Sequence, residues 1–151
     1  MTTAPRIFEG GEAWLATRAW ATTAEAAPPV PFVLVTVKGF EADQVRVCTA
    51  GSAAEQRVPA SALSASNSEV QPDNALLLNL SEAALLDNIL RRYSQEEPYT
   101  FTGGILTSVN PCKSTQLYTA DKMTSYAGRL LGGGRPPHLY AIAEEVWTAE
   151  H

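Results

Sequence analysis

A short strand, turn and strand between two prolines constrains this chain more than any other part of its sequence. Residues 99–102 alternate aromatic with polar side chains, Gly103 and Gly104 follow, and residues 105–109 return as an apolar and β-branched stretch. Glycine pairs favour tight turns and prolines interrupt strands, so the pattern predicts a β-hairpin that begins after Pro98 and ends before Pro111. Because two strands alone are marginally stable in water, the hairpin must pack against other elements.

A helix is predicted immediately before the hairpin. Ser81 is a suitable N-cap, and Glu82 lies in the first turn, where a carboxylate meets the positive end of the helix dipole. Five apolar side chains at helical spacing predict the packed face: Leu85, Leu86, Ile89, Leu90 and Tyr93. Polar side chains fall on the other face: Asp87, Asn88, Arg91 and Arg92.

Two more helices are predicted after the hairpin. The first begins at Thr119 and Asp121, ends at the glycine run 132–134, and has these apolar positions: Met123, Tyr126, Ala127 and Leu130. The second begins at Pro136 and Pro137, and its apolar face is wide: Leu139, Ile142, Ala143, Val146 and Trp147. A face so wide near the end of the chain needs a partner surface.

The first 63 residues show the pattern of short strands. Strands are predicted at 13–16, 32–37, 44–48 and 56–59, with a turn at 38–43. This spacing favours a small antiparallel barrel, with an open sheet as the alternative. The serine- and asparagine-rich stretch 61–73 predicts a connector between two parts of the chain.

Composition excludes several classes of protein. The 151 residues are 45% hydrophobic with a formal net charge of −5, and the basic residues are scattered, which disfavours a protein that binds nucleic acid. No apolar stretch is long enough to span a membrane, and the N-terminus lacks the pattern of a signal peptide, so a cytosolic location is the default. We expect Cys48 and Cys112 to be free thiols rather than a disulfide.

Three features imitate catalytic motifs. Lys113-Ser114 is not the end of a phosphate-binding loop, because Cys112 and Thr107 stand where that motif needs glycine. His138 has no partner identifiable by motif, which favours a role in packing or capping at the start of a helix. The adjacent glutamates 96–97 and 144–145 are expected to be solvated charges rather than a pair of catalytic carboxylates.

The order and spacing of these segments resemble the myosin heavy-chain motor from about Asp73 to Trp147. The matching pieces are Leu90-Arg91-Arg92-Tyr93, Tyr99-Thr100-Phe101-Thr102-Gly103, Val109-Asn110-Pro111 with Lys113, Leu117-Tyr118, Tyr126 with Gly128-Arg129, and Pro137-His138 through Ala143. The preceding part is similar in length and strand pattern to the Src homology 3-like barrel found before many conventional myosin motors.

The resemblance implies an α+β fold in two domains. Residues 12–63 would form the Src homology 3-like β-barrel and residues 64–73 a linker. Residues 74–151 would be an N-terminal fragment of the motor domain, in which helices and the β-hairpin form the N-terminal edge of the motor's α/β sheet.

The resemblance also implies a nucleotide site. In myosins the loop after this hairpin borders the purine ring of ATP, and the matching residues here are Asn110, Pro111, Lys113 and Tyr118. An amide, a rigid proline, an ammonium group and a phenol are suited to the edges and face of a purine nucleotide. Three residues depart from the family pattern: Pro98, Cys112 and Ser114. The alternative is that Asn110-Pro111 only makes a turn and Tyr118 packs in a core.

The expected function is therefore divided between this chain and a longer parent. The parent would be an actin-based, ATP-driven motor of the cytoplasm and cytoskeleton that uses ATP and Mg²⁺. This chain ends before any phosphate loop, so we expect a fragment without catalytic or metal-binding residues that neither binds ATP firmly nor hydrolyses it, nor binds actin. The alternative function is a non-catalytic adaptor that binds another protein through a small β-barrel.

Overall fold

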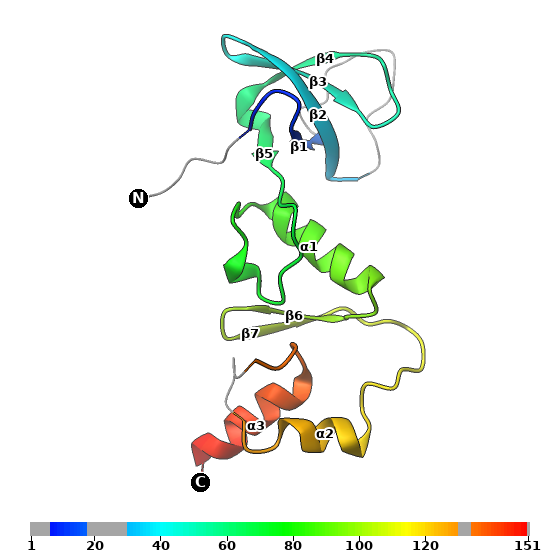
Figure 1. Cartoon of the computed structure of the whole chain (residues 1–151), viewed down its shortest axis with the longest axis vertical. Coiled ribbons are helices and arrows are strands. Elements are labelled where there is room, and N and C mark those ends of the chain that lie inside the picture. The colour runs from blue at the N-terminus through cyan, green and yellow to red at the C-terminus, as the bar shows by residue number, and fades with distance from the viewer. Residues whose placement is uncertain (1–6, 18–29, 130–133, 151) are drawn as a thin grey trace. The chain divides into compact units, whose positions relative to one another are not determined.

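A computed structural model describes residues 7–17, 30–129 and 134–150 (Figure 1). It is an α+β structure with antiparallel sheets, as expected. The chain divides into two compact units, the first comprising Met1–Ser68 and Leu78–Leu86, and the second Glu69–Leu77 and Asp87–His151. We describe each unit by itself.

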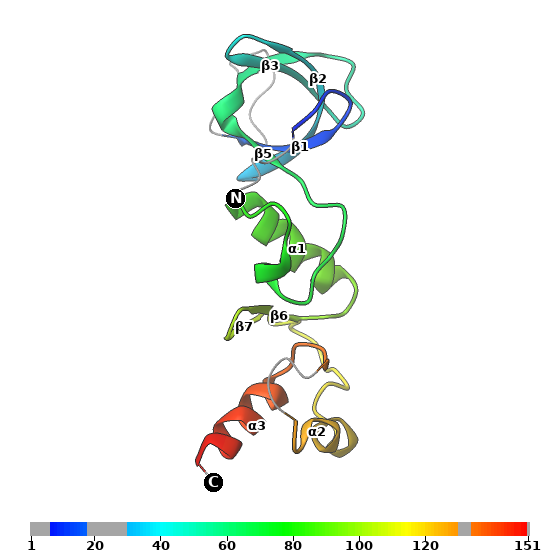
Figure 2. The same cartoon turned by 60° about the vertical axis from the view of Figure 1, so that its left-hand side comes forward.

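The first unit contains a five-stranded antiparallel sheet (Figure 2). Its strands are β1 (Glu12–Ala16), β2 (Phe32–Glu41), β3 (Gln44–Thr49), β4 (Gln56–Pro59) and β5 (Leu63–Ala65), arranged in the order β4-β3-β2-β1-β5. A short 3₁₀ turn, η2 (Ala60–Ala62), connects β4 to β5. The four strands predicted from sequence are confirmed.

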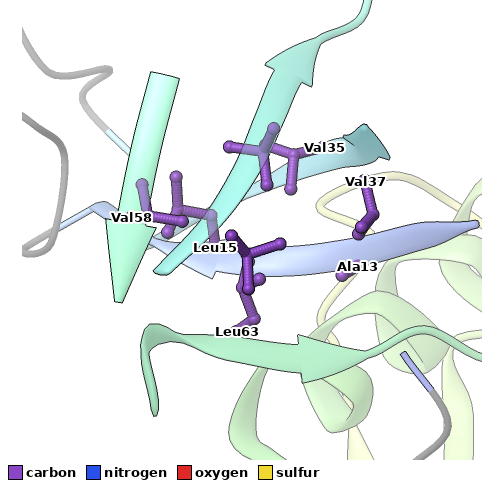
Figure 3. Packing of buried hydrophobic residues seen from close by; sticks show 8 residues of the cluster. Ala13, Leu15, Val35, Val37, Val58 and Leu63 are labelled. Atoms are coloured by element: carbon purple, nitrogen blue, oxygen red, sulfur yellow. The ribbon is translucent and has the colours of Figure 1, made fainter. Parts of the chain in front are cut away.

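The core of this unit is apolar and consists mostly of β-branched side chains (Figure 3). Alternate residues of each strand point to one side of the sheet, and they pack together as Ala13, Leu15, Val35, Val37, Val45, Val47, Val58 and Leu63. β-branched side chains such as valine pack well on the pleated surface of a sheet. This explains why a pattern of alternating apolar residues predicted the strands.

One local prediction for this unit was wrong. The turn expected at 38–43 is shorter, because β2 continues to Glu41 and only Ala42 and Asp43 make the turn, with Ala42 at a φ of 52°. The pairing register shifts between Val37 and Gly39, as in a β-bulge, so the strand continues through the irregularity. A Cβ atom at Gly39 would lie 2.7 Å from Arg46 Nη2, the end of a flexible side chain that would have to shift.

The stretch predicted as a connector contains regular structure at its beginning. In β5, Ser64 pairs with Trp14 and Ala65 with Ala13. Asn67 then exchanges hydrogen bonds with Asn79, whose backbone N–H donates to Asn67 Oδ1 at 2.9 Å and whose carbonyl accepts from Asn67 Nδ2 at 2.8 Å. Side-chain amides can replace the backbone ladder in this way where no strand is present.

Helix α1 (Glu82–Ser94) forms where it was predicted, but the predicted packed face was wrong. The Ser81 hydroxyl accepts a hydrogen bond from Ala84 N at 3.1 Å, which confirms the cap. Asn88 is 2% exposed and Arg92 5%, whereas Leu90 is 65% exposed. Two side chains of the predicted polar face are therefore buried, whereas Leu85 and Ile89 of the predicted packed face are only partly buried.

Hydrogen bonding explains why these polar side chains are buried. Asn88 accepts from Gln71 N and donates to Gln71 O, both at 2.9 Å, and also donates to Asn74 Oδ1 at 2.8 Å. Arg92 donates to Tyr99 O through Nη2 at 2.9 Å and forms an ion pair with Glu97 at 2.8 Å. Each side chain satisfies groups that leucine cannot satisfy, so helical hydrophobicity alone assigned the wrong face.

The hairpin consists of β6 (Tyr99–Thr102) and β7 (Ile105–Ser108) and turns at Gly103, whose φ is 61°. This prediction is confirmed. A third segment lies alongside it, because Phe101 N donates to Pro72 O at 2.9 Å. Asp73 Oδ1 accepts from Gly103 N at 2.9 Å and from Ala75 N at 2.8 Å, at the start of the 3₁₀ helix η3 (Asn74–Leu76).

Two helices complete the second unit. Helix α2 (Ala120–Tyr126) is capped by Thr119 as predicted, but it ends well before residues 132–134, with Gly128 at a φ of 69° just beyond it. The predicted apolar position Leu130 lies outside the described residues. Helix α3 (Leu139–Glu150) begins two residues after Pro137.

The apolar faces of these helices are largely exposed, and within the described residues the wide face of α3 lacks the partner surface that it needs. Only Tyr126 is buried in α2, and Met123 is 54% exposed. In α3, Ala141 is buried and Ile142 is partly buried, while Leu139, Val146 and Trp147 are exposed. Phe101 of β6 packs in a small cluster with Tyr126 and Ala141, and Leu106, Tyr140 and Ile142 pack against this cluster.

Substitution of the buried asparagine distinguishes the two faces of α1. Asn88→Leu removes three hydrogen bonds and leaves both backbone groups of Gln71 unpaired, so we expect the free energy of unfolding to fall by about 1–3 kcal/mol. The matched variant Leu90→Ala truncates an exposed side chain and should cost less than about 0.5 kcal/mol. Urea titrations followed by circular dichroism measure both, and a larger loss in Leu90→Ala would restore the apolar stripe as the packed face.

Candidate functional site

The second unit contains an open pocket with a volume of about 570 Å³. One side comes from the end of α1 and the start of β6, and the other from the loop between β7 and α2. The lining residues are Tyr93, Glu96, Pro98, Pro111, Lys113, Ser114, Thr115, Gln116 and Leu117. Rings and aliphatic surfaces alternate with polar groups, an arrangement suited to a flat ligand with polar edges, and the volume is typical of small-molecule sites.

The loop side of the pocket is fixed where the chain leaves the hairpin. Val109 N donates to Pro98 O at 2.9 Å, which extends the pairing one residue beyond β7. The Asn110 side chain then accepts from Cys112 N at 2.9 Å and closes a turn around Pro111. Cys112 has a φ of 51°, so the chain changes direction immediately before Lys113.

The helix side of the pocket is fixed by the end of α1. Glu96 N donates to Tyr93 O at 3.1 Å and Glu97 N to Arg92 O at 3.0 Å, which closes the last turn. Glu96 has a φ of 65°, a left-handed conformation that commonly terminates helices and usually belongs to glycine. Here a carboxylate occupies that position and lines the pocket.

An ion pair joins the two sides. Lys113 Nζ lies 2.6 Å from Glu96 Oε1. The hydrogen bond and positive charge of Lys113 lower the pKa of Glu96, and the same interaction with Glu96 raises the pKa of Lys113. Both side chains are exposed, so solvent and salt screen the attraction.

Tyr118 lies next to the pocket lining rather than within it. Its hydroxyl forms a 2.6 Å hydrogen bond with the hydroxyl of Tyr99, and the side chain is 56% exposed. Burial, together with the hydrogen bond to Tyr118, raises the pKa of Tyr99 to about 12. The two phenols therefore tie the end of the loop to β6.

His138 is a buried structural histidine, as predicted. Its Nδ1 accepts from Tyr140 N at 3.1 Å at the start of α3, so Nε2 carries the proton and donates to Leu117 O at 3.0 Å. The ring stacks on Tyr126 with centroids 5.3 Å apart and meets Tyr99 edge-on at 5.0 Å. Burial lowers the pKa of His138. This favours the neutral ring, whose Nδ1 can accept the hydrogen bond from Tyr140 N at the start of α3.

The four residues expected from sequence lie in one loop but not all in the pocket. Pro111 and Lys113 line it, whereas Asn110 shapes the turn and Tyr118 anchors the end of the loop. Sequence reasoning missed Tyr93 and the other lining residues. Tyr93 was assigned to a packed helix stripe, and nothing in the local sequence marks the end of a helix as one side of a pocket.

The remaining chemical expectations concern cysteines, metals and membranes. Cys48 and Cys112 are free thiols, as predicted, with Cys48 buried and Cys112 exposed. Within residues 7–17, 30–129 and 134–150, no three acidic, histidine or cysteine side chains gather in a way that could hold a metal ion. No helix in the described part of the chain is long and apolar enough to cross a membrane.

Comparison with known proteins identifies similar sequences. The family model for the myosin head (motor domain) matches residues 71–150. Human Unconventional myosin-VI is 43% identical over 76 residues, which are 50% of this chain and 6% of that protein. Myosin heavy chain 95F of Drosophila melanogaster is 43% identical over 75 residues, covering 49% and 6% respectively. Myosin-VIIa of Drosophila melanogaster is 38% identical over 96 residues, covering 64% and 4%. The chain thus spans a small fraction of the length of these relatives.

Acidification should destabilise the second unit through His138. An unfolded histidine titrates near pH 6.5, and burial lowers the folded pKa, so the unfolded state binds more protons between the two values. The free energy of unfolding should therefore fall as the pH drops below about 6.5 and level off below the folded pKa. Hydrogen exchange of α3 amides between pH 5.5 and 7.5, corrected for the intrinsic exchange rate, measures this.

Two variants separate this histidine from other groups. His138→Asn keeps a side-chain acceptor for the cap and cannot titrate, so the pH slope should disappear. His151→Gln removes the chain's other histidine and should leave the slope unchanged. A slope that persists in His138→Asn would assign the effect to another group.

Proposed function

The chain belongs to the myosin head (motor domain) family, and from this membership we propose that it supplies the purine-side wall of the ATP site of an actin-based, ATP-driven motor. By itself it neither hydrolyses ATP nor binds actin. The observation that carries the proposal is the pocket between the end of α1 and the loop that follows β7.

The proposal gives each of the four loop residues a role. Pro111 offers a flat apolar surface to the base, and Lys113 offers an ammonium to sugar or phosphate oxygens. Asn110 and Tyr118 act from either end of the loop, where the Asn110 side chain accepts from Cys112 N and the Tyr118 hydroxyl is bonded to the Tyr99 hydroxyl. A nucleotide can recruit the remaining amide and phenol hydrogen-bonding capacity of both side chains.

Phosphoryl transfer needs more than these residues. It requires amide donors and a lysine around the phosphates, a bound magnesium ion and a positioned water. The sequence has no glycine-rich loop ending in Gly-Lys-Ser or Gly-Lys-Thr. The proposed contribution of this chain is therefore to bind and orient the purine. Other segments of a longer parent would complete the site that binds the phosphates and Mg²⁺.

We also propose identities for the two units in that parent. The five-stranded sheet of residues 12–65 is a Src homology 3-like barrel, a proposal supported by its short antiparallel strands and the 3₁₀ turn between β4 and β5. Hairpin β6–β7 is the N-terminal edge of the motor's larger sheet, and the parent acts on the actin cytoskeleton in the cytoplasm.

Binding of adenosine tests the purine wall directly. At millimolar adenosine we expect amide chemical shifts of residues 112–117 to move in a nuclear magnetic resonance titration of the full chain, because an open wall binds a base weakly. Ser114→Trp fills the pocket and should abolish the shifts. Thr148→Trp adds the same ring to an exposed position of α3 and should leave them intact.

Two results would contradict this proposal. One is the absence of shifts in the loop at any soluble adenosine concentration, and the other is equal shifts in Ser114→Trp. The coding sequence after the last codon tests the motor independently, since the next roughly 10 to 30 codons should encode Gly-Glu-Ser-Gly-Ala-Gly-Lys-Thr or a close variant. ATP hydrolysis or actin sedimentation by the 151-residue chain above background would refute its predicted inactivity.

A further inference from the structure

The ion pair between Glu96 and Lys113 spans the pocket that the proposed function assigns to a purine nucleotide. Both residues line the pocket, Lys113 Nζ lies 2.6 Å from Glu96 Oε1, and Lys113 is the one cation among the lining residues that the structure describes. The group best able to attract a phosphate is therefore engaged by a carboxylate of the same pocket.

The backbone presents both partners to each other. Glu96 occupies a left-handed position at the end of α1, held by its own N–H and that of Glu97. Lys113 follows Cys112, a second left-handed residue, whose N–H is held by the Asn110 side chain. Two non-glycine residues with positive φ, Glu96 and Cys112, thus bring the side chains of Glu96 and Lys113 together. Because the backbone is already held in these turns, formation of the ion pair costs little further backbone entropy.

The other charges near this pair are already engaged. The Glu97 carboxylate forms an ion pair with the buried Arg92 at 2.8 Å, on the helix beneath the turn. The loop residues that follow Lys113 in the lining are uncharged: Ser114, Thr115, Gln116 and Leu117. The charge that an incoming anion meets at the pocket is therefore set by Glu96 and Lys113 alone among these residues.

We propose that Glu96 is an internal competitor for the Lys113 ammonium, which the anionic group of a nucleotide must displace before it can bind there. The proposal rests on the purine wall described above and adds a determinant of ligand charge to it. An uncharged purine nucleoside can enter with the pair intact, whereas a phosphorylated one meets a carboxylate and must break the pair.

The strength of the pair makes displacement feasible. The Glu96 side chain is 76% exposed and that of Lys113 is 55% exposed, so their attraction is weak and screened by salt. A phosphate dianion carries more negative charge than a carboxylate, so it attracts the Lys113 ammonium more strongly and can displace the Glu96 carboxylate from it. Removal of the competing charge should raise affinity for a nucleotide by roughly two- to fivefold at low ionic strength, the range expected for exposed pairs.

Binding of adenosine and AMP to the full chain provides the test, with chemical-shift titrations in low salt. Glu96→Gln should raise affinity for AMP roughly two- to fivefold and leave affinity for adenosine unchanged. Lys113→Met should weaken AMP binding, and adding Glu96→Gln to it should have no further selective effect on AMP. Glu145→Gln removes one negative charge from an exposed position of α3 and should leave the ratio of the two affinities as in the wild type.

Several outcomes would overturn the competitor role. These are an equal change in both affinities in Glu96→Gln, no change in either, or a selective gain for AMP that survives in Lys113→Met. If adenosine still binds normally but the variants do not change AMP affinity selectively, only the competitor role of Glu96 is refuted and the purine wall stands. Absence of adenosine binding refutes the purine wall, and with it the role of Glu96.

A measurement without ligand tests the pair itself. The side-chain carbon resonance of Glu96 should titrate below the ordinary range of a glutamate in the wild type and return to that range in Lys113→Met. The Glu145 resonance serves as the control in both proteins. Identical titration of Glu96 in the two proteins would show that the pair is not formed in solution, and would overturn the proposal whatever the binding data show.

Discussion

One buried guanidinium organises the second unit. Arg92 cannot lose its charge, so its burial requires acceptors, and it finds them in the Tyr99 carbonyl, the Thr100 hydroxyl and the Glu97 carboxylate. These partners belong to β6 and to the turn that precedes it. The same side chain therefore sets where the hairpin begins and holds the turn from which Glu96 enters the pocket, so one side of the candidate site depends on a residue that never lines it.

Sequence patterns predicted elements better than they predicted faces. Four of the five strands of the first unit were predicted because buried valines alternate with exposed residues, whereas β5 fell within the predicted connector. Caps at Ser81 and Thr119 marked two helix starts. The face of α1 was missed because Asn88 is buried through hydrogen bonds to Gln71 and Asn74, which lie 17 and 14 residues away in the chain. Hydrophobic periodicity contains no information about such distant partners.

The candidate site divides in the same way. Its loop was recognisable from the order and spacing of several segments that together resemble a myosin motor, because Asn110-Pro111 alone indicates only a turn. The opposite side was not, because it depends on Glu96 adopting a left-handed conformation at the end of a helix, where sequence rules expect glycine. An adjacent pair of glutamates usually indicates solvated charge, and only the three-dimensional turn separates Glu96, which faces Lys113, from Glu97, which faces Arg92.

Exposed apolar side chains connect this architecture to the family. In the second unit Leu90 is 65% exposed and Ile105 is 70% exposed, on a helix and a strand whose other faces are well satisfied. A two-stranded hairpin has too few neighbours to cover both of its faces, even with Pro72 bonded to its edge. The chain belongs to a family whose relatives, such as human Unconventional myosin-VI, are many times longer, and in the motor proposed above such surfaces are candidates for contact with other segments. The pocket differs from these surfaces, because its shape is set by hydrogen bonds and backbone turns within the described residues rather than by apolar packing.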